Sequence, residues 1–163
     1  MNGRKDYEFL NIEQRKAMLA YFSSFVRKLP ISYITFVYRR SQFEDPARLM
    51  ERMGRDISSA MVEHLGFFQS FDDVKVYYDN GQRSIAESLH RAIEYALSKD
   101  AVVYRSAQPS EYRLSQAADY ICTMELTAIK YAEHTATATD EKFFGKWSDF
   151  KKGILKETRK KLV

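Results

Sequence analysis

The sequence predicts an α/β fold with a small parallel sheet. Three short segments rich in β-branched and aromatic residues alternate with longer segments whose apolar residues repeat at helical spacing. Strands that alternate with helices in this order are usually joined by right-handed crossovers and pair in parallel. The chain has 163 residues, which is long enough for one hydrophobic core. We therefore expect one α/β domain over residues 1–140 and a basic C-terminal helix over residues 141–163.

The first part of the chain predicts a strand with one helix before it and one helix after it. Residues 11–28 have apolar side chains at helical spacing, and a proline follows them. Residues 31–38 are apolar on both faces, which is typical of a buried strand. Asp45 followed by Pro46 indicates an N-cap with proline at the first helical position. The helix that begins there is expected to end near Gly66.

The second part continues the alternation. Strands are predicted over residues 74–78 and 101–104, each followed by a segment with helical periodicity, over residues 85–97 and 114–129. Three strands make a very small sheet, whose edges would need a partner. We therefore consider a second copy, or another chain, that completes the sheet.

Two aspartates are the leading candidates for chemistry. Asp79 closes the second predicted strand, and Asp119 interrupts an apolar helical run. A carboxylate is costly to desolvate unless it is paired, hydrogen-bonded or bound to a metal, so a shared Mg²⁺ or Mn²⁺ ion would explain both acids. Gln116, Asn80 and Ser106 are expected to support such a site. The alternatives stay open: Asp79 as an ordinary turn residue, and Asp119 as a solvent-facing or ion-paired side chain.

The positive charge is concentrated at the C-terminus. Residues 141–163 contain eight Lys or Arg and three acids, a net charge of +5, while the whole chain carries +4. Such a segment attracts nucleic acid, or it keeps a helix soluble. The candidate nucleic-acid-binding residues are Lys151, Lys152, Lys156, Arg159, Lys160 and Lys161.

The same segment carries aromatic residues at helical spacing. Phe143, Trp147, Phe150 and Ile154 follow one another at i, i+4, i+7 and i+11, which predicts an amphipathic helix. Two interpretations are open. The stripe docks on the domain, or it lies on a membrane surface.

Other kinds of site have little support. His64, His90 and His134 lie on separate segments without ligand spacing, and no phosphate-binding glycine motif is present. Cys122 is the only cysteine, which excludes an internal disulfide framework, and its place in an apolar run predicts a buried, inert thiol. No segment reads as a signal peptide or a membrane span. We expect a cytoplasmic protein.

Three stretches resemble the DUF3800 family of domains of unknown function. They are residues 76–79, residues 110–121 with the Gln-x-Ala-Asp element, and residues 143–152 with the basic end. The resemblance implies a ribonuclease H-like three-layer fold, with Asp79 and Asp119 as acidic metal ligands and Gln116 as their neighbour. Family members usually begin with a strand bearing Asp-Glu-Ser-Gly, which is absent here. The resemblance therefore implies an N-terminally truncated form of the fold.

Two functions follow as expectations. The first is a divalent-metal-dependent nuclease domain that hydrolyses phosphodiesters and is inactive as this chain alone, because the acid of the first strand is missing. The alternative is a non-catalytic module of the same fold that binds nucleic acid or another protein. Nucleic acid is the expected partner, and a membrane is not.

Overall fold

A computed structural model describes residues 11–72, 74–77, 90–91, 93–94, 102–104 and 113–163. The chain divides into two compact units. Unit 1 comprises Met1–Thr35 and Gln116–Val163, and unit 2 comprises Phe36–Ser115. The C-terminal segment thus belongs to the same unit as the first helix.

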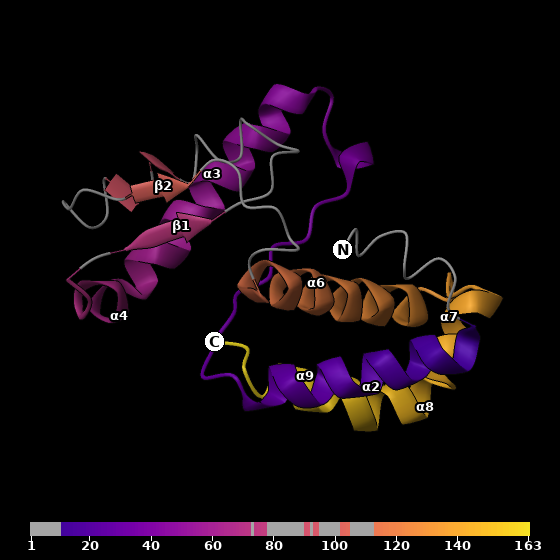
Figure 1. Ribbon diagram of the computed structural model, residues 1–163. Helices are drawn as coiled ribbons and strands as arrows, with labels where there is room; N and C mark the ends of the chain where they lie inside the picture. The colour runs from indigo at the N-terminus through magenta and orange to yellow at the C-terminus, as the bar shows by residue number, and fades with distance from the viewer. Residues whose placement is uncertain (1–10, 73, 78–89, 92, 95–101, 105–112) are drawn as a thin grey trace. The chain divides into compact units, whose positions relative to one another are not determined.

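Unit 1 is an assembly of helices. Its long helices are α2 (Ile12–Lys28) and α6 (Arg113–Ala132). After α6 come α7 (Ala138–Phe144), α8 (Trp147–Phe150), the π-helical turn η2 (Lys151–Leu155) and α9 (Lys156–Arg159). In Figure 1, α2 and the C-terminal helices lie alongside α6, and buried side chains from all of them form one core cluster.

The helix α2 forms and ends as the sequence predicts. Asn11 is its N-cap, and its side chain accepts a hydrogen bond from the Gln14 backbone N–H while the Gln14 side chain accepts one from Asn11, a complete capping box. Its last residue is Lys28, two positions before Pro30. The inner face of α2 buries Val26 against α6.

The helix α6 supplies most of the core of unit 1. Met124 is fully buried, with Ala117, Ile121 and Ala128 beside it on the same face. These positions recur every three or four residues, which is the period of one helix face. Small alanines at two of them let neighbouring helices approach closely.

The C-terminal segment docks on this core, as one interpretation of its aromatic stripe predicts. Phe150 is fully buried, and Trp147 and Ile154 pack partly buried against the cluster. The segment is not the single regular helix expected from the sequence. A kink at Gly153, where the backbone angles are non-helical, separates α8 from α9. The kink brings Leu155, rather than Ile154, into the fully buried position.

The predicted strand at residues 31–38 is wrong. The described chain there contains only an isolated bridge, in which the Tyr33 N–H donates to Lys161 O and Tyr33 O accepts from the Val163 N–H. A strand needs a continuous ladder, and in this segment only the chain end pairs with it. The apolar residues instead serve as a connector, and Ile31 and Tyr33 pack on the helical core.

Unit 2 contains α3 (Pro46–Glu63), α4 (Leu65–Gln69), a short 3₁₀ turn (Arg40–Gln42), and the strands β1 (Lys75–Tyr77) and β2 (Val102–Tyr104). The predicted start of α3 is confirmed, because the Asp45 side chain accepts a hydrogen bond from the Arg48 N–H at 2.8 Å. The predicted end near Gly66 is wrong, since His64 caps α3 and Gly66 lies inside α4. The strands pair in parallel, with Lys75 beside Val102.

The α/β ribonuclease H-like fold is wrong for this chain. In the described residues, helices dominate and the only sheet is this pair of three-residue strands. A three-layer fold needs a central sheet that buries both its faces. Here the main core forms between helices of unit 1 instead. Most of the helix predicted over residues 85–97 lies outside the described residues.

Helices in the described ranges are too short or too polar to span a membrane.

Candidate nucleic-acid interface

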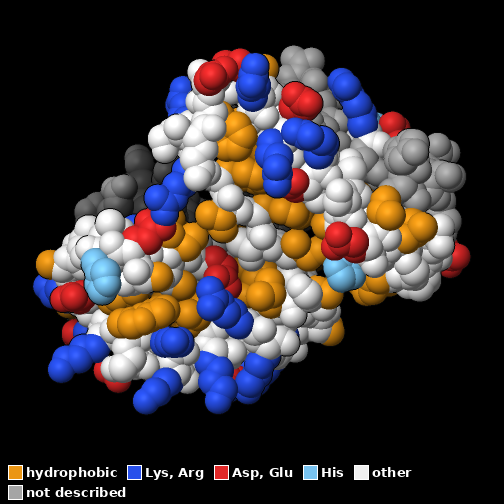
Figure 2. All heavy atoms as spheres, turned by 180° about the vertical axis from the view of Figure 1, so that it is seen from behind, with side chains coloured by type: hydrophobic (Ala, Val, Ile, Leu, Met, Phe, Trp, Pro, Cys, Tyr) orange, Lys and Arg blue, Asp and Glu red, His pale blue; other side chains and the backbone are white. Residues whose placement is uncertain are grey.

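A basic face covers the outer side of the C-terminal segment. Its residues line a shallow surface hollow that contains no acidic side chain. Figure 2 shows Lys and Arg side chains side by side along the lower edge of the molecular face that it presents. We use the name basic face for the cationic residues of this hollow, which are Lys151, Lys152, Lys156, Arg159 and Lys160.

The basic face follows from how the segment packs. Phe150 and Leu155 are each only 1% exposed and point into the core of unit 1. Since they hold the inner side of the segment, the lysines between and beyond them project outward. Lys152 and Lys156 are accordingly exposed, and neither forms an ion pair with any described residue.

Arg159 anchors the basic face to α6. Its guanidinium donates hydrogen bonds to both carboxylate oxygens of Glu125, the shortest at 2.7 Å, and the Tyr33 hydroxyl donates to the same carboxylate at 2.8 Å. Burial alone would raise the pKa of Glu125, but the hydrogen bonds from Arg159 and Tyr33 outweigh it and hold that pKa below its ordinary value. Burial and the Glu125 hydrogen bond raise the pKa of Tyr33.

The other predicted cations have distinct surroundings. Lys160 pairs with Glu157 at 2.7 Å, and the Lys151 ammonium lies 5.6 Å from the centre of the Trp147 ring. Lys161 does not line the hollow. Its ammonium donates to the backbone carbonyl of Leu29, which ties the chain end to the end of α2.

The structure describes only part of the predicted metal site. Asp79, Asn80 and Ser106 lie outside the described residues. Asp119 is exposed on α6, and Gln116 is half-buried one turn before it. Thr123 donates to the backbone carbonyl of Asp119 at 2.8 Å rather than to its carboxylate. Within the described ranges, no three His, Cys, Asp or Glu side chains cluster as metal ligands would. The Mg²⁺ or Mn²⁺ site stays a prediction.

The environment of Cys122 corrects one expectation. The side chain is exposed and not buried, because α6 turns its Cys122 side away from the core face that carries Ile121 and Met124. Partial burial of the sulfur and the nearby carboxylate of Asp119 raise the pKa of the thiol. The thiol is therefore mainly protonated at neutral pH.

The histidines lie at helix borders or pair locally. His64 caps α3, and His134 follows α6 with a positive φ of 57°. His90 contacts Glu94 at 2.9 Å. They lie on separate segments, as expected.

The anchor formed by Glu125, Arg159 and Tyr33 is not apparent from sequence spacing. Arg159 lies 34 positions and Tyr33 lies 92 positions from Glu125 along the chain. One signal was present: Glu125 directly follows Met124 and lies one turn from Ile121 and Ala128, so an acid occupies the apolar face of a helix. Such an acid requires a buried partner.

No family model, curated protein or solved structure matches this chain.

Proposed function

We propose that unit 1 is a non-catalytic module that binds the phosphate backbone of nucleic acid on its basic face. The observation that carries the proposal is the hollow lined by five cationic side chains and no acid. Lys152 and Lys156 support it further, because neither is held in an ion pair by a described residue.

The spacing of the cations favours a polymeric anion over a single small one. Lys156 and Lys160 are one helical turn apart, roughly 6 Å along the axis. Lys152 precedes Lys156 by four residues, on the other side of the kink at Gly153. A row of charges at this spacing can contact successive phosphates of one strand. Phosphate contacts position a strand without reading its bases, so we expect binding that is independent of sequence.

The first prediction concerns the triple variant Lys152→Gln, Lys156→Gln, Lys160→Gln. We expect wild-type protein to bind a single-stranded oligonucleotide with a dissociation constant on the order of 10⁻⁴ to 10⁻⁶ M at physiological salt, which is typical of non-specific binding. The triple variant should bind at least about tenfold more weakly and show a shallower dependence on salt. Fluorescence anisotropy over a salt series measures both quantities.

The matched control removes the same charge elsewhere. Lys28, Lys142 and Lys146 are exposed residues of unit 1 outside the hollow, and their triple glutamine variant should retain most of the affinity. If both triple variants lose affinity equally, net charge rather than the basic face drives binding. Absence of wild-type binding even at low salt would refute the proposal.

We propose a metal-dependent nuclease as the alternative function. The fold that the family resemblance implied is absent from the described chain, so the remaining support is the exposed carboxylate of Asp119, which forms no ion pair with described residues. An Asp79→Asn, Asp119→Asn double variant should lose Mn²⁺ binding in isothermal titration calorimetry. Equal Mn²⁺ binding by both proteins argues against a shared site. Cleavage by the pure wild-type protein, abolished in the double variant, would replace the non-catalytic proposal with the enzymatic one.

A further inference from the structure

Trp147 lies at the edge of the basic face and is the only tryptophan of the chain. It begins α8, and its side chain is partly buried against the core of unit 1. Lys151 follows four residues later and lines the hollow of the basic face, and its ammonium lies 5.6 Å from the centre of the indole ring. An aromatic ring therefore directly adjoins the row of cations.

The indole ring has a protein side and a solvent side. Tyr131 stacks on it with the ring centres 5.5 Å apart and 19° between the planes, and the Phe150 ring centre lies 6.1 Å away. Both neighbours are buried, at 7% and 1% exposed, so they hold the inner side of the ring. Lys151 is exposed, which places its ammonium on the solvent side. In the part of the chain that the structure describes, this outer side is thus covered by one long charged side chain and not by the core.

A nucleic-acid base can displace the ammonium from the ring. An exposed cation–π contact strengthens an association by a factor of only about two to five. A base stacked on an aromatic side chain contributes a factor of about five to 150. The displaced ammonium keeps a role, because Lys151 already lines the hollow of the basic face, where it can neutralise a phosphate. Stacking on Trp147 and a phosphate contact by Lys151 are therefore compatible.

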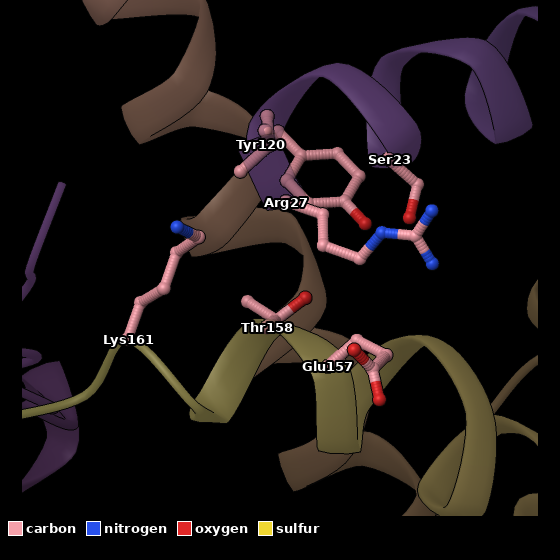
Figure 3. Close-up of a pocket in the computed structure, with 7 residues that line it drawn as sticks. Ser23, Arg27, Tyr120, Glu157, Thr158 and Lys161 are labelled. Atoms are coloured by element: carbon pink, nitrogen blue, oxygen red, sulfur yellow. The ribbon is translucent and has the colours of Figure 1, made fainter. Parts of the chain in front are cut away.

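The buried aromatic ring of Tyr120 offers no comparable surface. Tyr120 faces a small polar pocket where α2, α6 and α9 meet, which Arg27 and Glu157 also line (Figure 3). The space in it is about the size of one water molecule. The Tyr120 ring is packed against Phe22, with the ring centres 5.6 Å apart. A base cannot reach this ring, whereas the solvent side of Trp147 is accessible once Lys151 moves.

We propose that Trp147 stacks on a base of a single nucleic-acid strand whose phosphates contact the basic face. The inference rests on the proposed function and specifies its ligand as single-stranded. Bases of a duplex are paired and stacked on one another, so presenting one to Trp147 costs unstacking, whereas a single strand offers its bases freely. Every base has an aromatic face, so the expected preference is for single strands and not for a sequence.

The fluorescence of Trp147 tests the contact directly, because the full chain contains no other tryptophan. Titration with single-stranded oligothymidylate should quench it, and the quenching should saturate at the concentrations at which the anisotropy of a labelled strand shows binding. A duplex with the same number of phosphates should bind with little quenching. A strand of the same length without bases should also quench little and bind at least about fivefold more weakly, since it keeps the phosphates but loses stacking.

Trp147→Leu keeps an apolar side chain against the core and removes the aromatic face. It should bind oligothymidylate at least about fivefold more weakly and bind the base-free strand as wild type does. A purely structural role would weaken both ligands alike. Thermal unfolding checks that the variant is folded. If it is not, the quenching of wild-type protein by the three ligands decides the question by itself.

Tyr21→Leu is the matched control. Tyr21 is 79% exposed on α2 in unit 1 and does not line the hollow. Its substitution should leave the affinity for both strands unchanged. Equal losses in Tyr21→Leu and Trp147→Leu would contradict a specific contact at Trp147.

The two proposals fail in different ways. Binding of oligothymidylate without quenching, or equal affinity for strands with and without bases, would overturn the stacking contact and leave the proposed function in place. Absence of binding to any strand, even at low salt, would refute the proposed function and the stacking contact with it. Quenching by the single strand, together with a loss of affinity confined to Trp147→Leu, supports both.

Discussion

At the scale of single residues, the carboxylate of Glu125 holds three distant parts of unit 1 together. It accepts hydrogen bonds from Tyr33 in the connector after α2 and from Arg159 in α9, while its own backbone belongs to α6. Glu125 is only 8% exposed. An ionised carboxylate at such a position is tolerated because both oxygens have donors.

Glu125→Gln tests this anchor. We expect the free energy of unfolding to fall by about 1–3 kcal/mol, because a charge-assisted bidentate contact becomes a neutral one and the Arg159 guanidinium loses its counter-charge. Urea denaturation at neutral pH measures the change. Glu13→Gln is the control, since Glu13 lies in an exposed pair with Lys16 at 3.6 Å and should cost little.

The same residue makes stability depend on pH. The pKa of Glu125 in the folded protein lies below its ordinary value of 4.5. Its contribution is therefore fully present above the unfolded pKa and is lost as pH falls through the lower folded pKa. Denaturation curves between about pH 3 and 6 should show a smaller loss of stability in Glu125→Gln than in wild type. An identical acid dependence in both proteins would contradict the assigned role.

At the scale of elements, the C-terminal segment shows how a local irregularity arranges a surface. Phe150 and Leu155 are five residues apart, yet both are fully buried. A regular α-helix has 3.6 residues per turn, so two residues five positions apart would not lie on the same face. The kink at Gly153 between them changes the rotation of the chain, so both side chains face the core and Lys151 and Lys152 are left on the outer side.

The glycines of this region should differ in their tolerance of substitution. Gly145 caps α7 with φ of +75°, a region that L side chains rarely adopt, and its carbonyl accepts a hydrogen bond from Tyr131. Gly145→Ala should therefore lower the free energy of unfolding by about 1–2 kcal/mol. Gly153 has a negative φ and no atom within 4 Å of an added Cβ, so Gly153→Ala should cost less. Equal losses in urea denaturation would contradict this assignment.

At the scale of the whole molecule, the basic C-terminal segment also contributes to the hydrophobic core. The segment 141–163 carries a net charge of +5, which identified it as the basic part of the chain. Its inner side also contributes Phe150 and Leu155 to the core of unit 1. The segment is thus both a structural element of unit 1 and a strongly basic surface.

Local features of the fold could be predicted where local chemistry decides them. The capping residues Asn11 and Asp45 begin α2 and α3 as expected, because a cap depends on groups three residues away. The helical spacing of Trp147 and Phe150 predicted an amphipathic segment, and of its two open interpretations the docked one is observed. Predictions that depend on a distant partner were wrong. The sequence placed Ile154 on the buried face, whereas Leu155 takes the fully buried position.

For the candidate site, the sequence alone determined which residues carry positive charge, where α2 and α3 begin, and that an aromatic stripe starts at Phe143. Tertiary structure decided that residues 31–38 form a connector and not a strand, that Glu125 meets Arg159, and that Tyr120 faces a polar pocket. The physical reason is the same in each case. Helix caps and periodicity depend on groups within a turn or two, whereas strand pairing, buried ion pairs and pockets exist only when segments far apart in sequence meet.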